Sequence, residues 1–446
     1  MYVSKLTLEN VRSFRKLEFD FRRPDRSLAG WTVFLGGNSS GKSTLLKAIA
    51  LSLMGPDAAR QLVGNGLGWI TQGEKSAESI VSVEWDVAQD SFKSTGAKPG
   101  GDFDAGVKLS VVPTDPLAPP TLRSIEKRST LGTRQQPAQR GPWNPVARGW
   151  FSAGYGPMRR LSGSSSESMR YATEIGAVGR FVTLFREDAA LSESEEWLRK
   201  NYSRTLESHG RNDLEKLLQS ISTMLGDGLL PYNMKISRLS VDHVYVKDSR
   251  GIELPMRDIS DGCRSVYATV LDIVHGLYEV YGYEGLFKEA STGQIYVDRP
   301  GVVLIDEIEA HLHPAWQRDI PIWLKSHFPK IQFLVTTHSP MVAQAADAHG
   351  IFVLPSLSDT AREPRRLTDD EFEKIRWGRA EKTLLGSAFG LDSTRSNWAN
   401  EQIDRWKKLK AKKLAMGTLP DKEQEELAAL KGQLEIALDP TPELEG

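Results

Sequence analysis

The spacing of apolar residues along this chain changes between a period of two and a helical period, and this change predicts an α/β fold. Near the N-terminus, residues 2–8 and 15–21 alternate apolar and polar positions. This alternation predicts two strands with a turn between them at residues 9–14. The run Trp31-Thr-Val-Phe-Leu35 is almost uninterrupted in its apolar character, as is typical of a strand buried on both faces.

Helical spacing follows this strand in residues 44–54 and stops at Gly55-Pro56, which predicts the end of a helix. Later in the chain, apolar runs at 301–305 and 332–336 predict two more buried strands, with a helix beginning at Pro314 between them. Because strand, helix and strand alternate there, we expect a parallel sheet faced by helices.

The remaining segments are patterned more loosely. Three strand-like stretches precede a helical region that runs to about Leu225, and residues 234–254 alternate like a hairpin. The tail predicts two polar helices, at 397–413 and 421–436, whose lysines and glutamates are expected to pair. We therefore predict four segments: half of an α/β domain at 1–60, an inserted α/β and helical segment at 61–230, the other half at 231–355 and a helical tail at 356–446.

Composition narrows the class of protein. The 446 residues are 39% apolar and 26% charged, which is typical of a globular protein. Cys263 is the single cysteine, so an internal disulfide is excluded and a reducing compartment fits. The apolar runs are too short to cross a bilayer, and we expect a cytoplasmic protein with no membrane partner. The net charge of −1 gives no global attraction for nucleic acid, so a nucleic-acid surface would have to be local.

A phosphate-binding loop joins the first buried strand to the first helix. It consists of Gly36, Gly37, Asn38, Ser39, Ser40, Gly41, Lys42, Ser43 and Thr44, and it fits the pattern Gly-x-x-x-x-Gly-Lys-Ser. Its glycines let several backbone N–H groups turn toward one phosphate at a helix start. Lys42 then supplies a charge to the terminal phosphates, and Ser43 offers a hydroxyl to Mg²⁺. We expect ATP and Mg²⁺ as cofactors.

Two carboxylates follow the strand at 301–305. Asp306 and Glu307 are adjacent at its end, so their side chains point in different directions. We expect Asp306 to face the metal and Glu307 to orient or deprotonate the attacking water. His338 follows the next strand and is expected at the same sheet edge, where its ring can donate a hydrogen bond to the γ-phosphate. Glu309, His311 and His313 suggest a separate metal site as an alternative to a turn.

Ser260, Asp261 and Gly262 open a helix that is predicted to run to Tyr281. Taken in order, the phosphate loop, this Ser-Asp-Gly, the acidic pair with Leu312-His-Pro314, and Thr337-His338-Ser resemble the motifs of the ABC-type ATPases of the SMC, RecF and OLD group. The resemblance implies an ABC-type α/β head with a mixed parallel sheet, an inserted α/β segment and a helical tail.

The resemblance also implies roles that spacing does not reveal. In that group, the loop that Ser260 and Gly262 resemble contacts the nucleotide bound by a second subunit. ATP is then held between the two subunits of a homodimer, or of a multiple of dimers. Arg12 resembles the arginine that reaches the nucleotide phosphates. Arg159, in Tyr155-Gly-Pro-Met-Arg159, and Gln72 compete for the position of the Q-loop.

The chain lacks the long heptad segment of SMC proteins, and about ninety residues after the last ATPase strand leave no room for an OLD-type nuclease. It therefore looks like the stand-alone ATPases of anti-phage systems of the Septu, PARIS or retron type. This resemblance implies slow hydrolysis of Mg-ATP that controls a separate effector subunit, such as a nuclease. The alternative is a RecF-like repair ATPase that acts as a clamp on DNA.

Residues 113–145 are rich in Pro, Arg, Gln and Ser and predict an exposed loop. Basic residues between 122 and 150, with Trp143 and Trp150, leave two interpretations open. A solvated loop is one, and contact with a nucleic-acid backbone with stacking on bases is the other.

Overall fold

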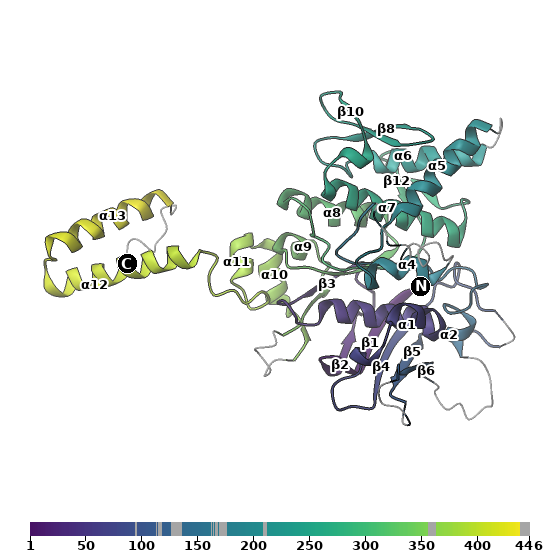
Figure 1. Cartoon of the computed structure of the whole chain (residues 1–446), viewed down its shortest axis with the longest axis horizontal. Helices are drawn as coiled ribbons and strands as arrows, with labels where there is room; N and C mark the ends of the chain where they lie inside the picture. Colours follow the sequence, from purple (N-terminus) through teal and green to yellow (C-terminus); the bar gives the residue numbers. More distant parts are fainter. Residues whose placement is uncertain are drawn as a thin grey trace. The chain divides into compact units, whose positions relative to one another are not determined.

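The computed structural model describes residues 1–93, 96–112, 114, 118–125, 136–161, 163, 165, 168, 176–207, 212–355 and 363–437 (Figure 1). The chain divides into two compact units, Met1–Ala380 and Glu381–Gly446. The first unit contains two large sheets, and the second is a helical hairpin.

The first sheet is antiparallel and has the strand order β2-β1-β4-β5-β6. Its strands are β1 (Tyr2–Val11), β2 (Phe14–Asp20), β4 (Ser76–Glu84), β5 (Phe103–Ser110) and β6 (Thr121–Ser124). Val11 pairs with Phe14, so the turn predicted at residues 9–14 shrinks to the two residues Arg12 and Ser13. Burial of Val11 and Phe14 extends both strands, and Arg12 closes the loop with a left-handed φ of 51°.

The second sheet has the order β16-β15-β3-β14-β13-β7. Its strands are β3 (Trp31–Leu35), β7 (Ser152–Tyr155), β13 (Gly301–Ile305), β14 (Ile331–Thr336), β15 (Ile351–Val353) and β16 (Arg365–Arg366). The pairs are parallel except β15 with β16. Every residue of β3, β13 and β14 is buried, as in sheets covered on both faces. The α/β class with a mixed parallel sheet is thereby confirmed.

Helix α1 (Lys42–Val63) packs against both sheets, touching β4 and β5 on one side and β13 and β14 on the other (Figure 1). The predicted helix end at Gly55-Pro56 is a break in the helix, because Gly55 has φ 77° and ψ 170°. A second helical segment nevertheless continues from there to Val63. The ring of Trp143 occupies the space beside Gly55 and donates its indole N–H to the carbonyl of Ser52 at 2.9 Å.

The rest of the first unit is mainly helical. It contains η1 (Leu67–Trp69), α2 (Pro137–Arg140), α4 (Ala177–Phe185), α5 (Ser192–Glu207), α6 (Asn212–Leu225), η2 (Met256–Asp258), α7 (Asp261–Tyr281), α8 (Pro314–His327), α9 (Pro340–Gln344) and α10 (Asp369–Trp377). Helix α11 (Ala380–Leu384) begins at the last residue of the first unit, and its other residues belong to the second. Small antiparallel sheets are formed by β8 (Lys235–Leu239), β9 (Val244–Lys247) and β10 (Glu253–Pro255), and by β11 (Phe287–Glu289) and β12 (Ile295–Val297). Helix α7 has the bounds that its pattern predicts, and it packs against α5 and β7. Among the described residues, no helix is long and apolar enough to cross a membrane.

The second unit consists of α12 (Asn397–Met416) and α13 (Asp421–Ala437), which pack against each other. Its small core contains Trp406, Leu409, Leu419 and Leu430. The predicted pairing of basic and acidic residues is confirmed. Arg405 contacts Glu426 at 2.9 Å, and Lys412 contacts Glu423 at 2.7 Å.

Candidate nucleotide-binding site

The phosphate loop lies between the carboxyl end of β3 and the first turn of α1. Gly41 has φ 94°, which favours glycine, and a Cβ added there would come within 2.5 Å of the Phe14 ring. The loop closes around its own lysine, because Lys42 Nζ donates to the carbonyls of Gly36 and Gly37, both at 2.9 Å. Burial lowers the pKa of Lys42, while Glu307 and Asp306 oppose that shift.

A cavity of about 440 Å³ opens above this loop. Its lining comes from the β1–β2 hairpin, the loop, and the ends of β13 and β14, and consists of Arg12, Ser13, Asn38, Ser39, Ser40, Gly41, Lys42, Ser43, Thr44, Glu307 and His338. Segments that are far apart in the sequence therefore converge at one edge of the parallel sheet. Gly36, Gly37 and Asp306 are not among the residues that line the cavity, and neither are Ser260 and Gly262.

The Thr336 hydroxyl holds the two carboxylate residues in place. It donates to Asp306 Oδ1 at 2.5 Å and accepts the backbone N–H of Glu307 at 2.8 Å. Asp306 is buried, with 2% of its surface exposed, whereas Glu307 has a φ of 44° and its side chain lines the cavity. Adjacent carboxylates thus occupy different environments, as their place at a strand end predicts.

His338 lies on a turn that Glu309 stabilises. Glu309 accepts the Thr337 hydroxyl at 2.6 Å and the backbone N–H of His338 at 2.5 Å. Burial, followed by the charge of Lys42, lowers the pKa of His338, so its ring is neutral near pH 7 and one ring nitrogen can donate a hydrogen bond.

The residues considered for a separate metal site have other partners. Both carboxylate oxygens of Glu309 accept hydrogen bonds from the turn that carries His338. His313 caps α8, because its Nδ1 accepts the backbone N–H of Ala315 at 3.3 Å. The turn interpretation of this segment therefore accounts for these contacts.

Arg12 is held at the mouth of the cavity. Its guanidinium donates to the Thr44 hydroxyl at 3.2 Å and lies 4.5 Å from the centre of the Trp69 ring. The backbone N–H of Arg12 also donates to the Trp69 carbonyl at 2.9 Å. Burial lowers the pKa of Arg12. No local pattern links Trp69 to this site, since the contact joins residues far apart in the chain.

Arg159 has a different position from the one considered for a Q-loop. It is buried and donates to the carbonyls of Asp306, Glu307 and Ile308 at 2.8 to 3.2 Å, and to the Ser265 hydroxyl of α7 at 3.3 Å. Burial lowers its pKa to about 10. Through these hydrogen bonds, Arg159 links residues 306–308 to helix α7. Neither Arg159 nor Gln72 lines the cavity.

The start of α7 packs on the turn before α8. A Cβ on Gly262 would meet the His311 carbonyl oxygen at 2.4 Å, so glycine permits this approach. The Ser260 hydroxyl donates to Cys263 Sγ at 3.2 Å. One chain therefore does not place Ser260 and Gly262 against its own phosphate loop.

Of the segment predicted to be an exposed loop, the described residues 118–125 and 136–145 contain β6 and α2, contrary to that expectation. Arg140 in this segment is 6% exposed, and Trp150 just after it is 4% exposed. The Trp150 indole N–H donates to the Ser91 carbonyl at 2.7 Å, and Trp143 packs beside α1. Both tryptophan rings pack against other parts of the protein, so they are not available to stack on bases. Lys127, Arg128 and Arg134 lie outside the described residues.

The cavity suits Mg-ATP. The Ser40 hydroxyl is buried and has no hydrogen-bond partner within the part of the chain that the structure describes. Such a group requires a partner, and a nucleotide phosphate on the loop supplies acceptors at this position. Lys42 has the charge to contact terminal phosphates, and Ser43 and Asp306 have the hard oxygen ligands that Mg²⁺ prefers.

Two family models and several known proteins are similar to this chain. A family described as "AAA domain, putative AbiEii toxin, Type IV TA system" matches residues 137–343, and an "AAA domain" family matches residues 5–112. Septu protein PtuA of Bacillus mycoides (strain KBAB4) is 25% identical over 97% of this chain and 50% of its own length. Retron Ec83 probable ATPase of Escherichia coli is 36% identical over 27% of this chain and 20% of its own length. The chain thus spans half or less of these two relatives.

Among solved structures, an Smc head bound to the C-winged helix domain of ScpA aligns at 16% identity with a TM-score of 0.47, over 83% of this chain and 99% of that one. The two AAA-domain matches fall on the phosphate loop in one case and on the acidic pair and His338 in the other. The chain is thus similar to AAA-domain proteins over these two segments, and to Septu protein PtuA and a retron probable ATPase.

Proposed function

We propose that the chain binds Mg-ATP in the phosphate-loop cavity and hydrolyses it to ADP and phosphate. The observation that carries this proposal is the convergence of Lys42, Glu307 and His338 on one cavity. A bare nucleotide-binding loop needs no carboxylate facing it, whereas hydrolysis needs a group that orients and deprotonates water.

In this proposal each residue has one task. Lys42 gives up its hydrogen bonds to the carbonyls of Gly36 and Gly37 and donates to the terminal phosphates instead. Ser43 and Asp306 hold the metal. Bound Mg²⁺ supplies charge that offsets the developing negative charge on the phosphates. Glu307 accepts a proton from the attacking water, and neutral His338 donates a hydrogen bond to the γ-phosphate.

A second copy of the chain completes the site in this proposal. Ser260 and Gly262 open α7 and lie outside the cavity of their own chain, so their suggested contact with nucleotide requires another subunit. Two copies arranged head to tail, each giving its α7 start to the other's phosphate loop, form a closed homodimer. Larger assemblies are multiples of this pair.

The ATP state is proposed to control a separate effector, such as a nuclease, in anti-phage defence. This part is supported by similarity to Septu protein PtuA and to a retron ATPase. The alternative, a RecF-like clamp on DNA, has less support, because Trp143 and Trp150 pack inside the protein. Strong, salt-sensitive DNA affinity of the isolated chain would favour this alternative.

The test combines turnover and mass. Glu307→Gln keeps the shape of the side chain but removes the base, so it should lose ATP turnover and accumulate as an ATP-bound dimer in light scattering with Mg-ATP. Glu425→Gln, an exposed change in α13, is the matched control and should behave like wild type. Wild-type turnover that persists in Glu307→Gln would contradict the role of Glu307, and a mass that ignores ATP would contradict the dimer.

A further inference from the structure

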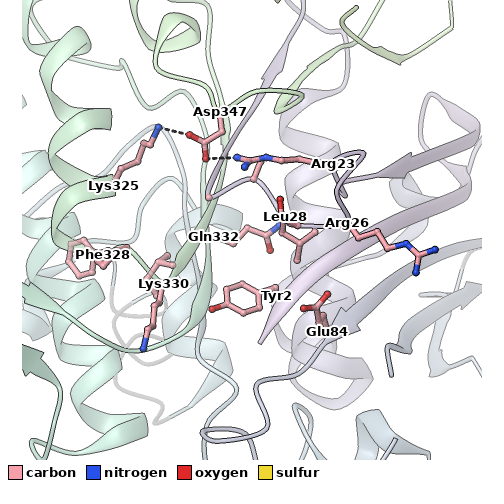
Figure 2. Close-up of a pocket in the computed structure, with 15 residues that line it drawn as sticks. Tyr2, Arg23, Arg26, Leu28, Glu84, Lys325, Phe328, Lys330, Gln332 and Asp347 are labelled. Atoms are coloured by element: carbon pink, nitrogen blue, oxygen red, sulfur yellow. Dashed lines mark hydrogen bonds and ion pairs between the residues drawn. The ribbon is translucent and has the colours of Figure 1, made fainter. Parts of the chain in front are cut away.

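A second cavity, of about 470 Å³, lies at the opposite end of the same parallel strands. The nucleotide cavity lies beyond Leu35 and Thr336, at the carboxyl ends of β3 and β14. The second cavity lies at the amino ends of these strands, beside Gly30 and Ile331. Figure 2 shows its labelled lining side chains. The full lining consists of Tyr2, Arg23, Arg26, Ser27, Leu28, Ala29, Gly30, Glu84, Lys325, Phe328, Pro329, Lys330, Ile331, Gln332 and Asp347. We call it the amino-edge cavity.

The amino-edge cavity has an excess of positive charge. Four basic side chains line it, but only two carboxylates do. Two of the cations share Asp347, since Lys325 Nζ lies 2.5 Å from its Oδ1 and an Arg23 Nη lies 3.3 Å from its Oδ2 (Figure 2). The same carboxylate also accepts the backbone N–H of Trp31 at 3.0 Å. Both carboxylate oxygens of Asp347 are therefore already bonded within the protein, and its single negative charge does not balance the two positive charges of Lys325 and Arg23.

The Arg23 side chain lines this cavity and is 26% exposed. Its Nε is buried and has no hydrogen-bond partner among the described residues, so a ligand in the cavity would reach the exposed part of the guanidinium and not Nε. A guanidinium can donate hydrogen bonds to two oxygens of one phosphate or carboxylate.

The remaining walls set the size and shape of a ligand. Gln332 is not available to a ligand, because its side-chain amide accepts from Val3 N–H at 2.7 Å and donates to the Val3 carbonyl at 2.9 Å. Tyr2 and Leu28 give the cavity aromatic and apolar surface beside the cations, and Phe328 is buried behind them (Figure 2). The volume lies in the range of small-molecule sites, and is too large for an inorganic anion alone to fill.

From these observations we propose that the amino-edge cavity binds a phosphorylated small molecule of about nucleotide size. The phosphate is placed near Arg23, Lys325 and Lys330, and the organic part contacts Tyr2 and Leu28. This site is separate from the phosphate loop, so the proposal does not depend on ATP hydrolysis. The strands β3 and β14 connect the two cavities directly.

The test measures binding to the full-length chain in a Lys42→Ala background, which weakens phosphate binding at the loop. The probes are 5′-nucleoside monophosphates and ribose 5-phosphate, each followed by titration calorimetry. The corresponding nucleosides and ribose serve as uncharged controls. At least one phosphorylated probe is expected to bind, and its uncharged counterpart is expected not to bind. If the counterpart binds equally well, the phosphate assignment is wrong.

Lys330 and Lys288 provide a matched pair of variants. Both form an ion pair with Asp298, but only Lys330 lines the amino-edge cavity. Lys330→Ala should weaken binding of the phosphorylated probe by about tenfold, as expected for loss of one charged contact, while Lys288→Ala leaves it unchanged. Arg23→Gln should weaken binding further, and Lys330→Ala still decides the matter if that variant does not fold. Absence of binding by every phosphorylated probe, or equal binding by the Lys330 and Lys288 variants, would overturn the proposal.

Discussion

The proposed chemistry depends on the hydroxyl group of Thr336. It bridges Asp306 Oδ1 and the backbone N–H of Glu307, so it positions both carboxylate residues without touching the cavity. Thr336→Val keeps the shape but removes the bridge, and we expect it to cost about 1.5–3 kcal/mol of unfolding free energy because the lost bond involves a charged acceptor. It should also lower kcat more than it raises KM.

Thr336→Ser is the control for this prediction, because it keeps the hydroxyl and removes only a methyl group. Steady-state ATPase kinetics and denaturant unfolding of both variants provide the measurement. If Thr336→Ser and Thr336→Val lose kcat equally, the hydroxyl bridge is not what positions Glu307.

Glu193 is a half-buried acid whose charge destabilises the fold. Burial, followed by the nearby charge of Asp272, raises its pKa to about 7, and within the described residues its Oε1 has no hydrogen-bond partner. Because the folded pKa is above that of the unfolded chain, the folded state binds the proton more tightly. Stability from this residue is therefore present below about pH 4.5 and is lost as the pH rises to about 7.

Glu193→Gln should consequently stabilise the protein at pH 8, by about 1–2 kcal/mol after allowance for partial solvent screening, and have little effect near pH 4.5. Denaturant unfolding at both pH values measures the difference. Glu196→Gln is the control on the same helix, since Glu196 is exposed and pairs with Lys200 at 2.8 Å. A gain at pH 8 in the Glu196 variant, or none in the Glu193 variant, would contradict this account.

At the scale of elements, the contact between the start of α7 and the turn before α8 is controlled by one glycine. Gly262→Ala would bring a methyl group within 2.4 Å of the His311 carbonyl oxygen, so α7 or the turn must shift. We expect a loss of about 1–3 kcal/mol in unfolding free energy, in the range of other overpacked sites. ATP turnover should fall as well, because this turn follows Glu307.

Gly432→Ala is the matched change, since Gly432 is also helical but has nothing within 4 Å of an added Cβ. It should stabilise the hairpin of α12 and α13 by about 0.5–1 kcal/mol, as alanine favours a helix interior. Thermal unfolding of the two variants would show opposite shifts. A neutral Gly262→Ala would mean that the turn moves freely.

Sequence patterns predicted the elements that have strong local signals. The bounds of α7 and β13 agree with their apolar patterns, and the phosphate loop lies at the predicted junction. The pattern failed at residues 113–145, where polar composition concealed β6 and the partly buried Trp143. Proline and arginine are typical of loops, but the burial of these residues depends on α1 and β5, which composition does not reveal.

Part of the candidate site was also predictable from the sequence. Lys42, Asp306, Glu307 and His338 belong to recognisable local motifs, and the topology of a parallel sheet explains why they share an edge. The roles of Thr336, Glu309 and Trp69 were not predicted, because each acts through a contact with a residue distant in sequence. The sequence suggests Glu309 only as a ligand of a separate metal site. A threonine at the end of a buried strand has no local feature that marks it as a partner of two carboxylate residues.

At the scale of the whole molecule, the proposed dimer divides each nucleotide site between two chains. One chain would give the phosphate loop, Glu307 and His338, and the other would give Ser260 and Gly262. A variant damaged in either half is then inactive as a homodimer. The two kinds of damage should nevertheless complement each other, since a mixed dimer contains one site built from two intact halves.

Mixing Lys42→Ala with Ser260→Arg tests this division directly. In an equal mixture with free exchange, half of the dimers are mixed and each has one intact site, so ATP turnover should recover to about a quarter of the wild-type rate. Lys42→Ala mixed with Glu307→Gln is the control, because both changes lie on the same half and no mixed dimer contains an intact site. No recovery with Ser260→Arg, when light scattering and labelled subunits prove exchange, would mean that a single chain builds its own complete site. Recovery in the control would instead mean that Lys42 and Glu307 act from different chains.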